Sequence, residues 1–162
     1  MQSKTLDSID WKLSIESVNL THMKISSMKG LEGILNLRQL NLSNNHINCI
    51  QFIDSCKLLE ELNLEKNYIN KITCLEGLVY LKKIELGKNK ISEVQGISTL
   101  NNLKELSLED NEIETLEGFP ELWSLMELYI GNNKISDSKH IKSLAGLTKL
   151  IILDLSGNPI SK

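Results

Sequence analysis

Regularly spaced carboxylates are the residues of this chain whose types and spacing could do chemistry. Glu105 and Glu127 stand 22 residues apart, Glu61 stands 44 residues before Glu105, and Glu85 lies between these two. Carboxylates that meet in space can divide the general acid and general base work of glycoside hydrolysis. Whether these acids meet in a suitable environment depends on the elements that present them.

A repeated pattern, L-x-x-L-x-L-x-x-N-x-I, explains the spacing of the carboxylates. Its six complete copies begin at Leu37, Leu59, Leu81, Leu103, Leu125 and Leu150, and an imperfect copy begins at Ile15. The steps are 22 residues long, except for the last step of 25. Self-similarity at this period predicts a solenoid, because no single unit can bury its apolar side without its neighbours. We expect an N-terminal flank or cap at residues 1–14 and a repeat domain at residues 15–162, whose C-terminal cap is missing.

Each copy contains the alternation of a short strand. In residues 39–43, Leu40 and Leu42 face inward and the residues between them face outward. The segment that leads from the end of one strand back to the start of the next, which we call the return, carries apolar residues at every third position, such as Ile69 and Ile72. This spacing fits turns and short 3₁₀ segments. The fold class expected is α/β: a right-handed solenoid with a parallel sheet of about seven strands and 3₁₀ or short helical turns opposite. Because strands stack at about 4.8 Å and the bulkier returns need more room, we expect the strand side to be concave.

An asparagine follows each strand of the complete copies. These residues are Asn45, Asn67, Asn89, Asn111, Asn133 and Asn158. Their amides can satisfy backbone groups that the turn leaves unpaired, so we expect a structural role, with a ligand-binding ladder as the alternative. Met23 takes this place in the first unit, which we therefore expect to stack less regularly.

The outward positions three, five and seven of each copy define the surface where a partner would bind. Seven carboxylates and one lysine fall on these positions, so the concave face is expected to be acidic. The predicted partner-binding residues are Glu61, Glu65, Lys83, Glu85, Glu105, Glu109, Glu127, Tyr129 and Asp154. Like charges on neighbouring strands repel one another, whereas a concentrated field steers complementary partners. We interpret the face as a binding surface, and an ordinary solvated sheet is the alternative.

Tyr129 is the only aromatic residue on these outward positions. Gly131 is expected to leave open space beside it. The tyrosine could anchor a partner or cover neighbouring aliphatic side chains, and both interpretations stay open.

The two tryptophans and the extra residues of the longer last step are expected to lie at the ends of the stack or at the contacts between coils. We expect Trp123 to plug the seam between coils, and Trp11 to alternate with Leu13 and Ile15 as an edge strand over the first unit. The extra residues of the last step, around residues 136–140, are expected to form a small bulge.

The same arrangement argues against catalysis. Carboxylates on a broad open sheet are solvated, which leaves no means of raising the pKa of one acid above its partner's. His22, His46 and His140 belong to different repeat positions, and neither a metal-binding motif nor a glycine-rich phosphate loop is present. The sequence therefore predicts a protein that is not an enzyme and that holds no metal and no cofactor.

The stretch from Leu103 to Leu116, which continues from L-x-x-L-x-L-x-x-N-x-I into apolar triplets, resembles the 22-residue class of leucine-rich repeats. The chain is similar to the intracellular regulatory subunit of protein phosphatase 1, to the axonemal dynein light chain and to the spliceosomal A-prime protein. Bacterial internalins share the repeat, but they are exported and usually carry further domains, so the resemblance favours the intracellular proteins. It implies a protein-interaction module, because members generally bind other proteins through the concave face.

The net charge limits the kinds of partner that the protein can bind, and the cysteines indicate its cellular compartment. A formal charge of −3 gives no basic field for nucleic acid, so we expect a protein partner with a basic or amphipathic segment. No apolar run is long enough for a signal peptide or a membrane span, and Cys49, Cys56 and Cys74 form no C-x-x-C pair. We expect reduced thiols and a cytoplasmic protein, with the nucleus and the cilium left open.

Three alternatives to a free-standing interaction scaffold stay open. The chain could be a segment of a larger cytoskeletal or ciliary protein, or the regulatory subunit of an enzyme such as a phosphatase. The uncapped C-terminal end, with Leu150, Leu153 and Leu155, could also associate with a second copy.

Overall fold

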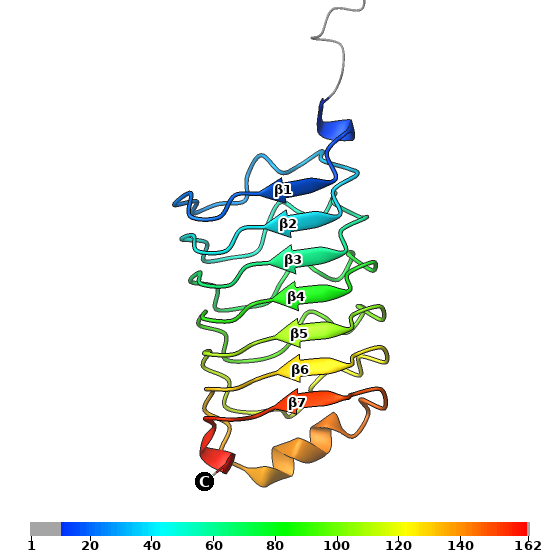
Figure 1. Ribbon diagram of the computed structural model, residues 1–162. Helices are drawn as coiled ribbons and strands as arrows, with labels where there is room; N and C mark the ends of the chain where they lie inside the picture. Colours follow the sequence, from blue (N-terminus) through cyan, green and yellow to red (C-terminus); the bar gives the residue numbers. More distant parts are fainter. Residues whose placement is uncertain (1–10, 162) are drawn as a thin grey trace, which may run out of the picture.

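The computed structural model describes residues 11–161 as a stack of coils with one short strand per coil (Figure 1). The strands are β1 (Ser17–Asn19), β2 (Gln39–Asn41), β3 (Glu61–Asn63), β4 (Lys83–Glu85), β5 (Glu105–Ser107), β6 (Glu127–Tyr129) and β7 (Ile152–Asp154). The described 3₁₀ helices are η2 (Trp11–Leu13), η3 (Ser138–Leu144) and η4 (Pro159–Ser161). All seven strands are parallel and pair in chain order, which confirms the expected solenoid and its parallel sheet.

The register of the sheet joins equal repeat positions of successive coils. Leu40 pairs with Leu62, and Leu62 pairs with Ile84, so the inward residues form one buried row. Glu127 pairs with Ile152 in the same way, although the last step is longer than the others. The extra residues therefore lie in the return and leave the sheet register unchanged.

The returns owe their three-residue rhythm to their hydrogen bonds. The N–H of Leu78 donates to the carbonyl of Leu75 at 2.9 Å, and the N–H of Leu81 donates to the carbonyl of Leu78 at 3.0 Å. Such bonds bring every third side chain to the same side of the chain. Leu75, Leu78 and Leu81 are all fully buried, so this side is the core.

Each coil also bends at positions where the backbone has a positive φ. The corner after each strand has φ between 53° and 70° and consists of His22, Asn44, Lys66, Lys88, Asp110, Asn132 and Gly157. A second corner in the return consists of Gly30, Phe52, Cys74, Gly96 and Gly118. Side chains other than glycine adopt this region only where surrounding contacts enforce it. The stacking of neighbouring coils supplies that constraint.

The N-terminal flank differs from the sequence prediction. The alternation of Trp11, Leu13 and Ile15 does not form an edge strand, because residues 11–13 wind into η2. The Nζ of Lys12 donates to the carbonyl of Glu32 at 2.9 Å. A side-chain hydrogen bond to the first return thus holds the flank in place, whereas an edge strand would be held by backbone hydrogen bonds to the neighbouring strand.

The long last step forms a helix. The predicted small bulge around residues 136–140 is wrong, because η3 begins at Ser138 and extends through the return (orange in Figure 1). Asp137 caps it, since its Oδ1 accepts the N–H of Lys139 at 2.8 Å. Leu144 is 7% exposed and attaches the helix to the core.

Trp123 does not plug a seam between coils. Its side chain is 52% exposed, whereas Leu122 and Leu125 are fully buried. The three-residue rhythm places these two leucines inside and leaves the residue after Leu122 on the surface. The prediction for Trp123 was wrong because the rhythm outweighs the preference of one large side chain for burial.

Candidate functional site

The outward side chains of the seven strands form one surface, which we call the strand face. It consists of three rows, and the first two rows start at Ser17 and Asn19 and follow the pairing of the strands. The ladder continues past the strands, because the N–H of Asn44 donates to the carbonyl of Glu65 at 2.9 Å. The third row, which starts at Thr21, therefore stays in register. The structure places all nine predicted partner-binding residues on the strand face.

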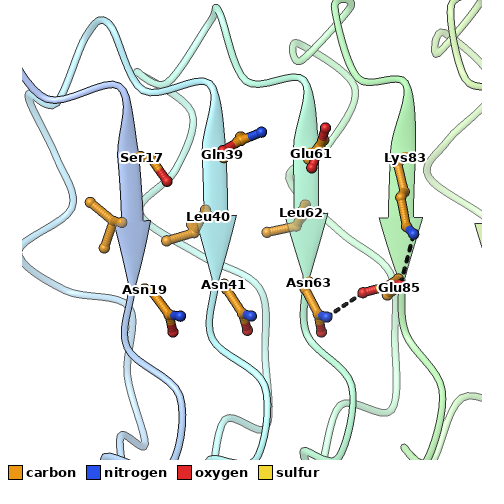
Figure 2. Close-up of a pocket in the computed structure, with 11 residues that line it drawn as sticks. Ser17, Asn19, Gln39, Leu40, Asn41, Glu61, Leu62, Asn63, Lys83 and Glu85 are labelled. Atoms are coloured by element: carbon orange, nitrogen blue, oxygen red, sulfur yellow. Dashed lines mark hydrogen bonds and ion pairs between the residues drawn. The ribbon is translucent and has the colours of Figure 1, made fainter.

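A groove of about 290 Å³ lies over β1 to β4 (Figure 2). Asn19, Asn41 and Asn63 lie in a row along it, and each Oδ1 accepts the backbone N–H two residues further on. This bond fixes each amide. Within residues 11–161, the Nδ2 groups of Asn19 and Asn41 donate to no protein atom. The groove thus offers fixed and free hydrogen-bond donors.

Sequence reasoning missed this groove. The predicted site extended from the third to the sixth strand because it was drawn from the charges, whereas the hollow begins at β1. Its signal in the sequence is the run of short amide and hydroxyl side chains at outward positions, such as Ser17, Asn19 and Asn41. Short side chains leave space that long glutamates would occupy.

Lys83 lies at the far end of the groove and interrupts the acidic surface. Its Nζ is 3.0 Å from Oε1 of Glu85 and 3.0 Å from Oε1 of Glu105. Hydrogen bonds to Glu105 and then Glu85 raise the pKa of the Lys83 ammonium group. Glu85 also accepts a hydrogen bond from Nδ2 of Asn63 (Figure 2). The centre of the predicted acidic site is therefore locally compensated.

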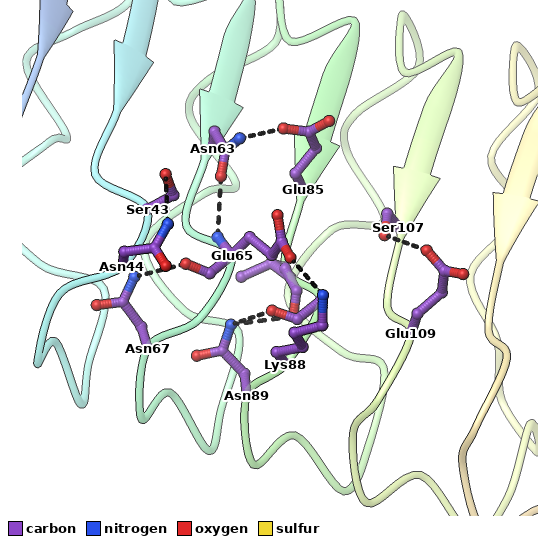
Figure 3. Close-up of polar contacts among 12 residues, drawn as sticks. Ser43, Asn44, Asn63, Glu65, Asn67, Glu85, Lys88, Asn89, Ser107 and Glu109 are labelled. Carbon is purple, nitrogen blue, oxygen red and sulfur yellow. Dashed lines mark hydrogen bonds and ion pairs between the residues drawn. The ribbon is translucent and has the colours of Figure 1, made fainter. Parts of the chain in front are cut away.

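A second hollow, of about 210 Å³, lies beside the third row over β4 and β5. Glu65, Gly87 and Glu109 line it together with two corner residues, Lys88 and Asp110. The Nζ of Lys88 is 2.9 Å from Oε1 of Glu65 (Figure 3). This ion pair raises the pKa of Lys88. A corner residue thus contributes to the rim of the strand face.

The remaining acids flank the compensated centre. Within residues 11–161, Glu61, Glu109, Glu127 and Asp154 form no ion pair. Glu61 lies on β3, and the other three lie on or beside β5 to β7. The negative field of the strand face therefore comes from two flanks and not from one continuous stripe.

Tyr129 lies between Ser107 and Asp154 in the register, as the repeat spacing predicts. Its hydroxyl donates to Oε2 of Glu127 at 2.8 Å, and this bond raises the pKa of the phenol. The open space expected at Gly131 is absent, because a Cβ there would lie 3.2 Å from Oγ of Ser156. The last coil therefore packs closely against Gly131 and fills the space that was expected beside Tyr129.

The six asparagines that follow the strands bond the backbone of two coils. In Asn89, Nδ2 donates to the carbonyls of Leu64 and Leu86, both at 3.0 Å, and Oδ1 accepts the N–H of Ile69 at 2.9 Å. The other members are Asn45, Asn67, Asn111, Asn133 and Asn158. All six are at most 8% exposed. Their amide groups are occupied by the backbone, so these residues stabilise the stack.

Among residues 11–161, no three side chains of His, Cys, Asp or Glu gather in a group that could hold a metal ion. Within the same range, no helix is both long and apolar enough to cross a membrane.

Comparison with known proteins agrees with the repeat geometry. Residues 81–121 match the family described as Leucine Rich repeats (2 copies), and residues 36–58 match the family described as Leucine Rich Repeat. No curated protein matches the chain. The repeat matches and the solenoid together support a leucine-rich repeat protein, a class whose members are generally protein-interaction scaffolds and typically not enzymes.

Solved structures of bacterial proteins resemble the chain over most of its length. An internalin (inlF) from Listeria monocytogenes has a TM-score of 0.78 and 27% identity, and the match covers 88% of this chain and 41% of the internalin. Internalin C2 (inlC2) from the same organism has a TM-score of 0.76 and 26% identity, over 93% of this chain and 75% of that one. A leucine-rich repeat protein of Leptospira interrogans has a TM-score of 0.64 and 28% identity, over 91% and 44% of the two chains.

These matches bear on the expected relatives. The chain spans 41% of the length of the first internalin structure. The internalins resemble the chain in structure, although the sequence, with no recognisable signal peptide or further domain, predicts the intracellular proteins as relatives. The closer resemblance to the phosphatase subunit, the dynein light chain and the A-prime protein stays a prediction.

Proposed function

We propose that this chain is a non-catalytic protein-interaction module that binds a basic or amphipathic partner segment along the strand face. The observation that carries the proposal is the groove over β1 to β4, in which the free amide donors of Asn19 and Asn41 lie beside Glu61, a carboxylate without an ion pair in the described part of the chain. The general role of leucine-rich repeat proteins as interaction scaffolds supports it.

The dimensions of the strand face suit an extended segment. Seven strands at about 4.8 Å spacing give a sheet roughly 29 Å long, which matches an extended chain of about nine residues. The carbonyls of such a segment can accept hydrogen bonds from Asn19 and Asn41, and its basic side chains can pair with Glu61 on one flank and Glu127 on the other. Because exposed ion pairs are screened, affinity should fall as salt rises.

The test uses a defined probe, a lysine-rich extended peptide of about nine residues. The strand-face variant combines Glu61→Gln with Glu127→Gln, and the control combines Glu114→Gln with Glu117→Gln, two exposed acids of a return. We expect the strand-face variant to weaken binding about tenfold, since two ion pairs are lost, and the control to leave it unchanged. Equal affinities for the two variants in isothermal titration would refute the proposed site.

The location of the protein forms part of the proposal. Cys49, Cys56 and Cys74 are free thiols, and burial raises the pKa of Cys56. Free thiols support a reducing, intracellular compartment. Isolation of the protein from its natural source with an intermolecular disulfide at Cys49 or Cys74 would contradict this location.

A second candidate role, association of two copies, rests on the apolar surface of the last described coil. Ile151 is 71% exposed and Leu153 is 39% exposed, although Leu153 takes an inward position of its strand. We propose that these side chains meet their counterparts in a second copy. Light scattering should show a mass that grows with concentration for the wild type and not for Ile151→Glu with Leu153→Glu. A wild-type monomer at every concentration excludes the role.

A further inference from the structure

A second charged surface borders the strand face where the strands end. We call it the basic edge, and it consists of Lys24, His46, Lys66, Tyr68, Lys88 and Lys90, all of which are exposed. These residues occupy two equivalent positions in the first four coils. Neither position holds a carboxylate in those coils, whereas the fifth coil has Asp110 and Glu112 there.

The local backbone explains why these side chains point outward. Asn67 and Asn89 turn inward to bond the backbone, and each lies between two residues of the basic edge. Lys66 and Lys88 have φ of 56° and 55°, so the chain bends there. The corner that buries the asparagine therefore exposes the residues on either side of it.

Aromatic and ionic contacts order the middle of the basic edge. The rings of His46 and Tyr68 lie 5.8 Å apart between centroids, and the Nζ of Lys90 lies 5.3 Å from the centre of the Tyr68 ring. A shallow hollow of about 420 Å³ lies over His46, Lys66, Tyr68 and Lys88. A ring that already contacts a cation and a histidine forms a fixed wall for this hollow.

Most of the positive charge on the basic edge is uncompensated. Within residues 11–161, no carboxylate pairs with the ammonium group of Lys24, Lys66 or Lys90, whereas Lys88 pairs with Glu65. Lys66 and Lys90, two cations without a carboxylate partner among the described residues, flank the exposed Tyr68 and form with it a surface that complements carboxylates next to apolar side chains.

We propose that the basic edge of the first four coils is a second binding surface, which takes an acidic segment of a polypeptide. An acidic polypeptide suits it better than a nucleic acid. Glu65 lies 2.9 Å from Lys88, and the strand face with its carboxylates begins there, so a phosphate at every residue would meet repulsion along this border. A peptide can place its carboxylates on the lysines and neutral side chains beside Glu65.

The basic edge and the strand face have opposite charge preferences, so their binding segments differ. A partner that engages both would carry a basic stretch for the strand face and an acidic stretch for the edge. This inference goes beyond the proposed function, and each surface can be tested without the other.

The experiment is an NMR titration of the labelled protein with a short polyglutamate peptide as the probe. The edge variant combines Lys66→Glu with Lys90→Glu, and the control combines Lys139→Glu with Lys142→Glu, two exposed lysines of η3. We expect saturable shifts at Tyr68 and a dissociation constant that rises about tenfold or more in the edge variant and not in the control. The milder pair Lys66→Gln with Lys90→Gln, whose folding is checked by circular dichroism, should show a smaller rise.

Three outcomes of the titration, and a fourth from the strand-face variant, would overturn the proposal. The first is the absence of saturable shifts at Tyr68 and His46. The second is an equal dissociation constant for the edge variant and the η3 control. The third is tighter binding of a single-stranded oligonucleotide than of polyglutamate at the same salt, which would assign the edge to nucleic acid. The strand-face pair Glu61→Gln with Glu127→Gln should retain polyglutamate binding, and its loss would also contradict a separate surface.

Discussion

At the scale of single residues, neighbouring positions of one turn have different roles: one stabilises the stack and the others are exposed for binding. Asn89 is buried and bonds carbonyls of two coils, while Lys88 and Lys90 on either side of it face solvent. On the strand itself, Asn41 uses only its Oδ1 and leaves Nδ2 available. The same residue type is thus fully bonded at one repeat position and free to bind a ligand at another.

Replacement of Asn89 by Asp should test the structural role of the buried amides. The carboxylate would face the carbonyls of Leu64 and Leu86 with no hydrogen to donate, so the free energy of unfolding should fall by about 3 kcal/mol. The exposed Asn101→Asp is the matched control and should cost little. Urea denaturation of both variants measures the difference. Similar costs would show that the amide bonds do not hold the coils together.

The Tyr129 hydroxyl gives a prediction for pH dependence. Its pKa is raised above the ordinary value by the bond to Glu127, so this bond contributes stability below the unfolded pKa. The contribution is lost as pH rises through the raised pKa of the folded state. Glu127→Gln should lower the Tyr129 pKa, as followed by its ring signals in an NMR titration. An unchanged pKa beside the control Glu114→Gln would exclude this cause.

At the scale of the elements, the coil is defined by its strand, its three-residue turns and its two corners. Gly96 and Gly118 occupy equivalent return corners, with φ of 72° and 71°. A Cβ on Gly96 would lie 2.6 Å from the carbonyl oxygen of Ile72, whereas a Cβ on Gly118 would meet no atom within 4 Å. Two corners with the same backbone therefore differ in how closely the neighbouring coil approaches.

This pair separates backbone strain from steric contact between coils. Gly118→Ala should lower the free energy of unfolding by about 1 kcal/mol, because alanine is strained at positive φ. Gly96→Ala should cost at least about 1 kcal/mol more, since overpacking is added to the same strain. Thermal or urea unfolding of the two variants provides the comparison. An equal decrease in the free energy of unfolding for both variants would mean that the neighbouring coil moves away from residue 96 without energetic cost.

The extent to which the sequence predicts the structure follows from what repeats. Leu40 and Leu62 were placed correctly because the two-residue alternation and the 22-residue step are both visible in the sequence. The salt bridges from Lys83 to Glu85 and Glu105 were not predicted. They depend on the conformation of the long Lys83 side chain, which the repeat pattern does not specify. The basic edge was missed for a different reason. Lys66 and Lys90 lie after the strand, outside the outward positions from which the site was built.

At the scale of the whole molecule, stacking converts repeat positions into long surfaces. The strand face has free amide donors over β1 and β2 and carboxylates from β3 to β7, and the basic edge follows the ends of the first four strands. Both surfaces arise from a core that every coil shares, so their charges can vary without loss of the fold. We therefore expect the exposed rows to determine which partner binds, and the leucines and asparagines beneath them to determine stability.

The most direct test of this account is the dissociation constant of a purified partner for the strand-face variant. The partner is first captured with the wild type, and its affinity is then compared for Glu61→Gln with Glu127→Gln and for the return control Glu114→Gln with Glu117→Gln. We predict an increase of about tenfold for the strand-face pair, a smaller difference at high salt, and no change for the control. An unchanged dissociation constant for the strand-face pair would show that the partner binds elsewhere on the molecule.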